Sequence, residues 1–189
     1  MITIEIKSGN QISWKNCRIL TYNLVMKLNK MYIAGGCFWG LEELFRDIEG
    51  VLDTEAGYCG GENDNPTYRD HPGHAETLMV EYDPAVVSYK ELLDWFFRVH
   101  NPTTLNRQGN DIGSSYRSAI FYQTEEEKET AEEMIEVVND SGCWDDPVVT
   151  TLEPYQRFWP AEPEHQDYLQ RYPGGYTCHA VYFDTYLQS

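Results

Sequence analysis

Cys37 is the residue whose type and surroundings best suit catalysis in this chain. It follows Gly35-Gly36 and precedes the aromatic pair Phe38-Trp39. Glycines let the backbone turn tightly and approach a ligand closely. The apolar residues after Cys37 have helical spacing, so N–H groups at a helix N-terminus should lie near its sulfur and favour the thiolate. Such a cysteine is either a nucleophile or a small side chain packed beside a turn.

Glu76 is a candidate general acid. In the alternating stretch 75–82 it shares a face with Leu78, Val80 and Tyr82, which we expect to be the buried face. Burial raises the pKa of a carboxyl group, as proton donation near neutral pH requires. The alternative is a carboxylate at the end of a strand that reaches solvent.

Loop residues supply further polar groups. Tyr68 and Tyr116 lie in or beside polar, Gly-rich loops, where a phenol can donate to a ligand oxygen. Asp111 lies in a turn sequence, and it either caps that turn or belongs to the site. Phe38 and Trp39 can form an apolar wall for a small hydrophobic group. The histidines have no ligand spacing, so we expect no metal site.

The predicted elements place Cys37 at a strand-to-helix junction. Their short connections favour a mixed, partly antiparallel sheet, so we predict an α+β fold. Residues 1–30 mix polar and apolar residues without a clear period. We interpret them as an N-terminal extension of uncertain order before a single domain at 31–189. Strands are predicted at 31–34, 51–58, 75–82, 116–122 and 148–153, and helices at 38–48, 88–100, 124–138 and 163–172.

The charge balance excludes some partners. The chain has 31 acidic and 14 basic residues and a net charge of −17. This surface repels nucleic acid and anionic membranes, and it is either simply well solvated or adapted to high salt. No apolar run reaches the roughly 20 residues of a membrane helix, and the N-terminus lacks the pattern of a secretory leader. We therefore expect a cytoplasmic monomer.

The whole set of motifs resembles the A-type peptide methionine sulfoxide reductases. The similarity runs in the family's order from about Met31 to about Ala180. It implies a two-layer α/β sandwich with a mixed, mostly antiparallel, ferredoxin-like sheet. The segments that carry it are Gly36–Gly40, Ala56–Gly61, Asn65–Tyr68, Gly73–Glu76, Tyr82–Pro84, Arg107–Gly113, Tyr116–Ser118 and Glu164–Leu169.

The resemblance also implies a reaction. Methionine-S-sulfoxide, free or in oxidised proteins, would be reduced to methionine without a cofactor. Cys37 would attack the sulfoxide sulfur and become a sulfenic acid. The resemblance implies methyl contacts for Phe38 and Trp39, hydrogen bonds to the sulfoxide oxygen for Tyr68, Tyr116 and Glu76 with Glu76 as proton donor, and a site-shaping role for Asp111.

Regeneration of Cys37 needs a second thiol. Cys178 lies in a Gly-rich C-terminal tail that we expect to be flexible enough to reach Cys37, while Cys59 in a Gly-rich loop is the alternative. We expect Cys17 and Cys143 to be spectators. Thioredoxin or a similar dithiol would then reduce the disulfide, which makes it the expected partner.

Three other classes of function remain as alternatives. A thiol-disulfide oxidoreductase or peroxidase would use Cys37 alone, but the chain has no C-x-x-C pair and Glu76 would have no task. A Cys–His hydrolase would form a thioester and would not need Cys178. An acidic binding module would leave the Cys37 junction unexplained.

Overall fold

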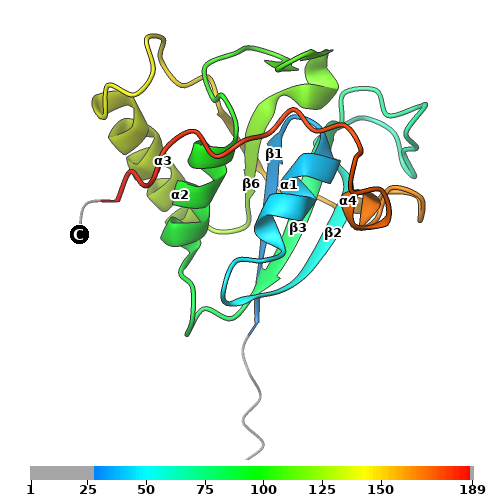
Figure 1. Cartoon of the computed structure of the whole chain (residues 1–189), viewed down its shortest axis with the longest axis horizontal. Coiled ribbons are helices and arrows are strands. Elements are labelled where there is room, and N and C mark those ends of the chain that lie inside the picture. Colours follow the sequence, from blue (N-terminus) through cyan, green and yellow to red (C-terminus); the bar gives the residue numbers. More distant parts are fainter. Residues whose placement is uncertain (1–27, 188–189) are drawn as a thin grey trace, which may run out of the picture.

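A six-stranded sheet forms the frame of the computed structural model, which describes residues 28–187 (Figure 1). Strand β1 (Asn29–Gly35) lies inside the sheet, and the apolar residues of its second half are buried. It pairs antiparallel with β3 (Ala75–Tyr82) on one side and with β6 (Ser118–Tyr122) on the other. Strand β2 (Val51–Cys59) pairs antiparallel with β3.

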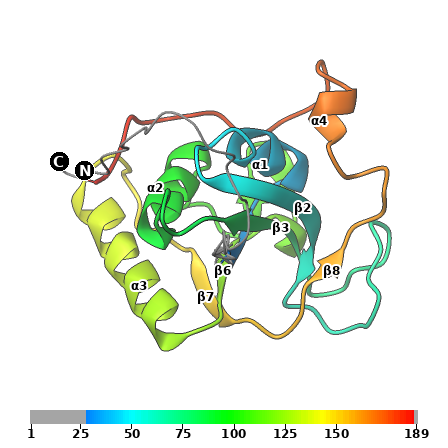
Figure 2. The same ribbon diagram turned by 90° about the horizontal axis from the view of Figure 1, so that it is seen from below.

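Two short strands complete the edges of the sheet (Figure 2). Strand β7 (Thr151–Pro154) runs parallel to β6, and β8 (Trp159–Pro160) runs antiparallel to β2. The resulting order is β7-β6-β1-β3-β2-β8. Only the β6–β7 pair is parallel within this sheet, so the predicted mixed, mostly antiparallel sheet is confirmed, and its inner order β6-β1-β3-β2 is that of a ferredoxin-like fold.

The helices form the second layer. Helices α1 (Phe38–Phe45), α2 (Tyr89–Val99) and α3 (Glu125–Asp140) bury their apolar stripes against one face of the sheet. On the opposite face, Tyr155 and Phe158 from the segment between β7 and β8 cover a smaller apolar cluster. The α+β class and the two-layer arrangement therefore agree with the prediction.

Capping residues set the starts of two helices. The Ser88 hydroxyl accepts a hydrogen bond from Glu91 N at 3.2 Å, and the Glu91 carboxylate accepts one from Ser88 N at 2.7 Å, so this capping box is complete. Thr124 likewise accepts from Glu127 N at 3.1 Å. However, the Glu127 carboxylate accepts from Gln123 N at 2.7 Å, one residue before the expected donor.

Several predicted boundaries were wrong. Helix α1 ends at Phe45, and the chain continues in turns to Gly50 with its φ of 96°. The predicted helix at 163–172 is regular only as α4 (Tyr168–Arg171), and the strand predicted at 148–153 begins at residue 151. Of the predicted extension 1–30, only residues 28–30 are described. Very short elements were missed because they show no periodicity: β4 (Arg107–Gln108), β5 (Asp111–Ile112), the 3-10 turn Ser114–Tyr116 and β8.

The C-terminal tail, residues 173–187, has no regular secondary structure, yet it is fastened to α2 (Figure 1). Arg98 Nε donates to Phe183 O at 2.9 Å. The buried Asp94 carboxylate accepts from Tyr186 N at 2.7 Å and from the Thr185 hydroxyl at 3.0 Å. These bonds fasten residues 183–186 of the tail to α2.

We expect Asp94→Ala to lower the free energy of unfolding by about 3 kcal/mol, because it leaves Arg98 and the Tyr186 N–H without their buried partner. Asp94 is 3% exposed, so water cannot readily replace the carboxylate. Urea unfolding checks this, with the exposed helical Glu129→Ala as the control at about 0.5 kcal/mol or less. Equal midpoints for the two variants would contradict the anchoring role.

Candidate active site

Cys37 lies between β1 and α1 as the N-cap residue of that helix, with extended backbone angles. The turn before it depends on Gly36, whose φ of 111° is costly for residues with a Cβ. The predicted strand-to-helix junction is therefore confirmed in the described chain. The Cys37 side chain is 5% exposed and belongs to a cluster with Phe38, Ala56 and Tyr58.

Glu76 reaches Cys37 from β3. Its Oε2 accepts the Phe38 backbone N–H at 3.1 Å, and the carboxyl group lies near enough to the Cys37 thiol to act on its pKa. Glu76 is 1% exposed, on the face that also buries Leu78 and Val80, as the alternation predicted. Burial, reinforced by the nearby charge of Asp111, raises the pKa of Glu76 to about 8 despite the N–H donor. A group with this pKa can hold and release a proton near neutral pH.

The expected preference of Cys37 for the thiolate was wrong. Burial raises the pKa of the Cys37 thiol well above its ordinary value, and the Glu76 carboxylate adds to this rise. The Trp39 backbone N–H lowers that pKa, as expected of a helix N-terminus, but its effect is smaller. Cys37 and Glu76 therefore hold their protons as neighbouring neutral groups until a ligand changes their surroundings.

The two tyrosines lie at the same site. Tyr68, in the loop after β2, is 38% exposed, and Tyr116 at the end of the 3-10 turn is half-buried. Burial, and after it the charge of the nearby Glu76, raises the pKa of both. Two neutral phenols beside a neutral acid can present several donors to one oxygen atom.

Trp39 forms an aromatic wall beside Cys37. Its ring stacks on Tyr168 with centroids 3.9 Å apart, and His165 and Tyr68 lie at 5.7 and 6.3 Å. Phe38 has no exposed surface in this conformation, so it supports the wall from the protein interior. It would reach a ligand only after the side chains of the site rearrange. The wall therefore comes from Trp39 and Tyr68 together with His165 and Tyr168, to which the sequence assigned no role in the site.

Cys178 is already beside Cys37. The half-buried Cys178 packs against the apolar cluster that contains Cys37, and the negative charge of Asp111 acts on its thiol. The Tyr176 hydroxyl donates to Asp111 Oδ2 at 3.1 Å, which fixes the tail against the hairpin β4–β5. Burial raises the pKa of Cys178 to about 12. The tail thus brings Cys178 to the site by docking, whereas we had expected mobility to do so.

The other described cysteines lie elsewhere. Cys59 follows Tyr58 in β2 and therefore points to the opposite face of the sheet, where it packs in the cluster with Phe121. Cys143 is exposed in the loop after α3. Cys17 lies outside the described residues. The geometry therefore favours Cys178 over Cys59 as the second thiol.

Two residues of the site were not predicted as site residues, although Gln108 lies in the segment Arg107–Gly113 that carries the resemblance. Gln108 is buried, and its side-chain amide donates to Gly35 O at 3.4 Å. His179 is buried beside Cys178, and its Nε2 lies 2.9 Å from the same carbonyl oxygen. Both contacts join segments distant in sequence, so periodicity could not reveal them. For His179, its adjacency to Cys178 was the one available clue.

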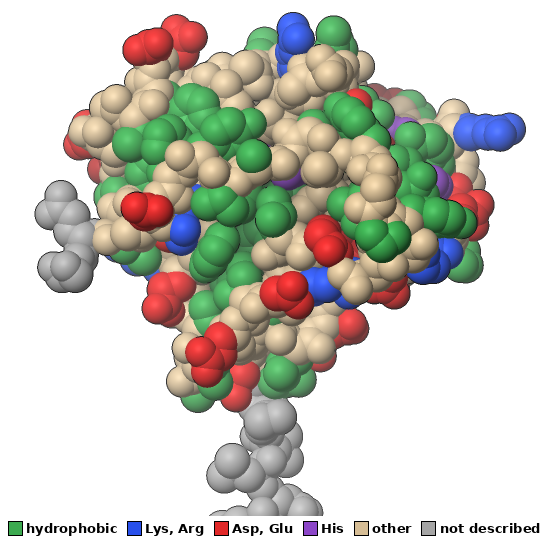
Figure 3. Space-filling view, in the orientation of Figure 1, with side chains coloured by type: hydrophobic (Ala, Val, Ile, Leu, Met, Phe, Trp, Pro, Cys, Tyr) green, Lys and Arg blue, Asp and Glu red, His purple; other side chains and the backbone are tan. Residues whose placement is uncertain are grey.

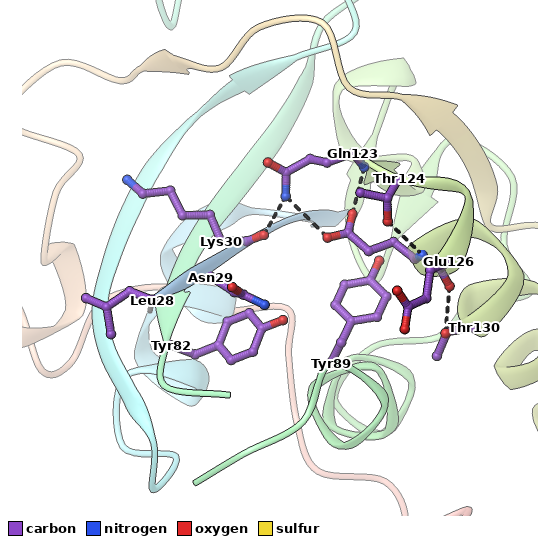
Figure 4. A pocket seen from close by; sticks show the side chains of 10 residues that line it. Leu28, Asn29, Lys30, Tyr82, Tyr89, Gln123, Thr124, Glu126 and Thr130 are labelled. Carbon is purple, nitrogen blue, oxygen red and sulfur yellow. Dashed lines mark hydrogen bonds between the residues drawn. The ribbon is translucent and has the colours of Figure 1, made fainter. Parts of the chain in front are cut away.

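A hollow away from Cys37 lacks the thiol chemistry of the candidate site. This hollow (Figure 4) has a volume of about 570 Å³ and lies at the start of β1, about 20 Å along the strand from Cys37. Its described lining includes the Gln123 amide, which donates to Lys30 O, and the phenols of Tyr82 and Tyr89, but no thiol. The thiol chemistry of the candidate site is therefore missing from this lining.

Metal, membrane and charge features add no second site within residues 28–187. No group of His, Cys, Asp and Glu there is arranged to hold a metal ion. None of the helices described in this range has both the length and the apolar character needed to cross a bilayer. Acidic side chains are spread over the face in Figure 3, with few basic ones between them.

Known proteins are similar to this chain in sequence and in fold. The family model described as peptide methionine sulfoxide reductase matches residues 29–187. The peptide methionine sulfoxide reductase MsrA of Mycolicibacterium gilvum is 59% identical over 147 residues, covering 78% of this chain and 87% of the relative. Mxr1 from Saccharomyces cerevisiae in reduced form superposes with a TM-score of 0.76 at 34% identity, covering 82% of this chain and 92% of that one. The complex of Mxr1 with Trx2 matches with a TM-score of 0.58 at 26% identity, covering 87% and 96%.

Proposed function

Since this chain belongs to the peptide methionine sulfoxide reductase family and reduces methionine-S-sulfoxide with thiols, we propose that Cys37 is the nucleophile and Glu76 the proton donor. The buried Glu76 carboxyl group, which accepts the Phe38 N–H beside the buried Cys37, carries this proposal. A sulfoxide has a polar S–O bond between two apolar carbons. The thiol suits attack on its sulfur, the acid suits its oxygen, and the aromatic wall suits its apolar carbons.

The first step transfers the sulfoxide oxygen. Cys37 attacks the sulfoxide sulfur and forms an S–S bond, its proton passes to Glu76, and the Glu76 proton goes to the sulfoxide oxygen, which would otherwise carry a negative charge. The hydroxyl group then moves from the methionine sulfur to Cys37 as the S–S bond breaks, so methionine leaves with that electron pair and Cys37 becomes a sulfenic acid. Two electrons move from the thiol to the sulfoxide. Tyr68 and Tyr116 donate hydrogen bonds to the same oxygen, and each such donor contributes about 3 kcal/mol to transition-state stabilisation.

Substrate orientation depends on the wall. Trp39 contacts the methyl group, and Phe38 holds Trp39 and Cys37 in place from below. Asp111 positions Cys178 and Tyr176. The open side at Tyr68 leaves room for the rest of a methionine residue, so both free methionine sulfoxide and oxidised proteins are substrates.

The second step regenerates a reducible form of the enzyme. Cys178 attacks the Cys37 sulfenic acid, a disulfide forms, and water leaves. Thioredoxin or a similar dithiol then reduces this disulfide, a proposal supported by the complex of Mxr1 with Trx2. We place the enzyme in the cytoplasm as a monomer, with Cys143 as a spectator and residues 1–30 as an extension to a domain at 31–189.

Stereospecific reduction tests this proposal. The reduced protein is incubated separately with the S and R epimers of a chromogenic methionine sulfoxide, with dithiothreitol as reductant. We expect methionine product from the S epimer alone and none from the Cys37→Ser variant. A Cys–His hydrolase, a disulfide oxidoreductase or a binding module would reduce neither epimer. Reduction of neither epimer would therefore end the proposal.

A further inference from the structure

The start of α1 contains a slot for the C-terminal tail. A Cβ at Gly40 would collide with His179 Nδ1 and with the Thr177 hydroxyl. A Cβ at Gly36 would lie 3.2 Å from Cys178 Sγ. Tail residues 177–179 can therefore approach the helix only because these two positions lack side chains, and the slot fixes Cys178 and His179 together.

The hydrogen bond to Gly35 decides which ring nitrogen of His179 carries the hydrogen. His179 Nε2 lies 2.9 Å from Gly35 O, and a carbonyl oxygen only accepts hydrogen bonds. In the neutral ring Nε2 is therefore the protonated nitrogen, and Nδ1 has a free lone pair. Nδ1 lies 3.5 Å from Cys178 Sγ, so the thiol donates to it.

We propose that His179 Nδ1 accepts the proton of Cys178 when Cys178 attacks the oxidised Cys37. This inference rests on the proposed function, which supplies the sulfenic acid. The S–H bond of Cys178 breaks, and its electron pair forms the S–S bond with Cys37. The S–O bond of Cys37 breaks at the same time, and the departing hydroxide takes the proton from His179 and leaves as water. Cys178 is oxidised and Cys37 is reduced, so no further reactant is needed.

Charged groups around His179 suit this role. Burial lowers the pKa of His179 to about 4, against the opposing effects of Gly35 O and the negative charge of Asp111, so the ring is neutral and able to accept a proton. The same Asp111 charge would stabilise the imidazolium once it forms. His100, whose pKa burial lowers to about 3, is the other histidine beside it and adds no charge.

Asp111 is the competing acceptor, since its negative charge also acts on the Cys178 thiol. However, His179 Nδ1 lies within hydrogen-bond distance of Cys178 Sγ, at 3.5 Å, whereas the Asp111 carboxylate accepts its hydrogen bond from the Tyr176 hydroxyl, at 3.1 Å. We therefore assign the proton transfer to His179 and a supporting charge to Asp111.

Single-turnover kinetics of His179→Gln test the assignment. Glutamine can still donate to Gly35 O, but it offers no basic nitrogen to Cys178. We expect disulfide formation to slow by about 100-fold relative to methionine formation. The sulfenic acid should accumulate and be trapped by dimedone. The rate of disulfide formation should be flat from roughly pH 6 to 9 in the wild type, but should rise about tenfold per pH unit in the variant, because hydroxide must then remove the proton.

Gly40→Ala shows what simple loss of docking does. Its Cβ pushes the tail out, so iodoacetamide should alkylate Cys178 much faster than in the reduced wild type. Slow alkylation of Cys178 in His179→Gln, together with slow disulfide formation, supports the proton-acceptor role. Alkylation as fast as in Gly40→Ala, a flat pH profile in His179→Gln, or a larger effect of Asp111→Asn would each overturn it. Absence of methionine from the wild type would instead reject the proposed function.

Discussion

Glu76→Gln should slow methionine formation by roughly 100- to 1,000-fold while changing substrate affinity only a few-fold. Glutamine has nearly the same shape and can still accept the Phe38 N–H, which Glu76 accepts at 3.1 Å. It cannot supply a proton, so the sulfoxide oxygen would leave without one. Rapid-quench measurement of the rate and the half-saturation concentration separates the two effects.

The pH profile gives the same prediction a second readout. The protonated carboxyl group is the active form of an acid, and its pKa is raised to about 8. The wild-type rate of methionine formation should therefore fall as pH rises through about 8, because the proton is lost there. This fall should be absent in Glu76→Gln. Glu81→Gln on the same strand, which removes only a surface contact with Lys30 at 3.4 Å, is the matched control. Equal losses of rate and affinity in Glu76→Gln would contradict the acid role.

Cys178→Ser should lose nearly all multiple turnover with thioredoxin while still forming methionine once. The first step needs Cys37 and Glu76, but return to the reduced enzyme needs a disulfide that thioredoxin can attack. The variant should therefore stop as the Cys37 sulfenic acid after one methionine per chain. A steady-state assay with a thioredoxin system measures this loss, and mass spectrometry after dimedone treatment identifies the trapped state.

Cys143→Ser and Cys59→Ser are the controls for that variant. Cys143 is exposed and distant from the site in the fold, so its removal should leave turnover intact. Cys59 faces the other side of the sheet, and we expect its removal to spare turnover as well. Full turnover by Cys178→Ser, with loss in Cys59→Ser, would move the resolving role to Cys59.

Sequence periodicity predicted the positions of Cys37 and Glu76, because these positions depend on one helix start and one strand. The helical spacing after Cys37 and the glycines before it located the junction, and the alternation of β3 placed Glu76 on the buried face. The strand rule also applied to Cys59. Because Tyr58 and Cys59 are consecutive in β2, they must point to opposite faces, which counts against a thiol partner for Cys37 there.

Contacts between distant segments could not be predicted in this way. The tail packs on α1 through Gly40 and His179, and its Cys178 packs against the cluster in which Cys37 is buried; this burial reverses the expected direction of the Cys37 pKa. Gln108 belongs to a two-residue strand without periodicity. Burial by residues more than a hundred positions away is a property of the fold, so the composition around Cys37 did not reveal it.

Counting products in a single turnover tests the central claim, that Cys37 reduces the sulfoxide and Cys178 resolves it. Pre-reduced wild type, Cys37→Ser and Cys178→Ser are each mixed with S-methionine sulfoxide, and methionine formed and thiols lost are measured. The mechanism predicts that wild type loses two thiols per methionine, Cys178→Ser loses one, and Cys37→Ser forms no methionine. Methionine formation by Cys37→Ser at the wild-type rate would contradict the account.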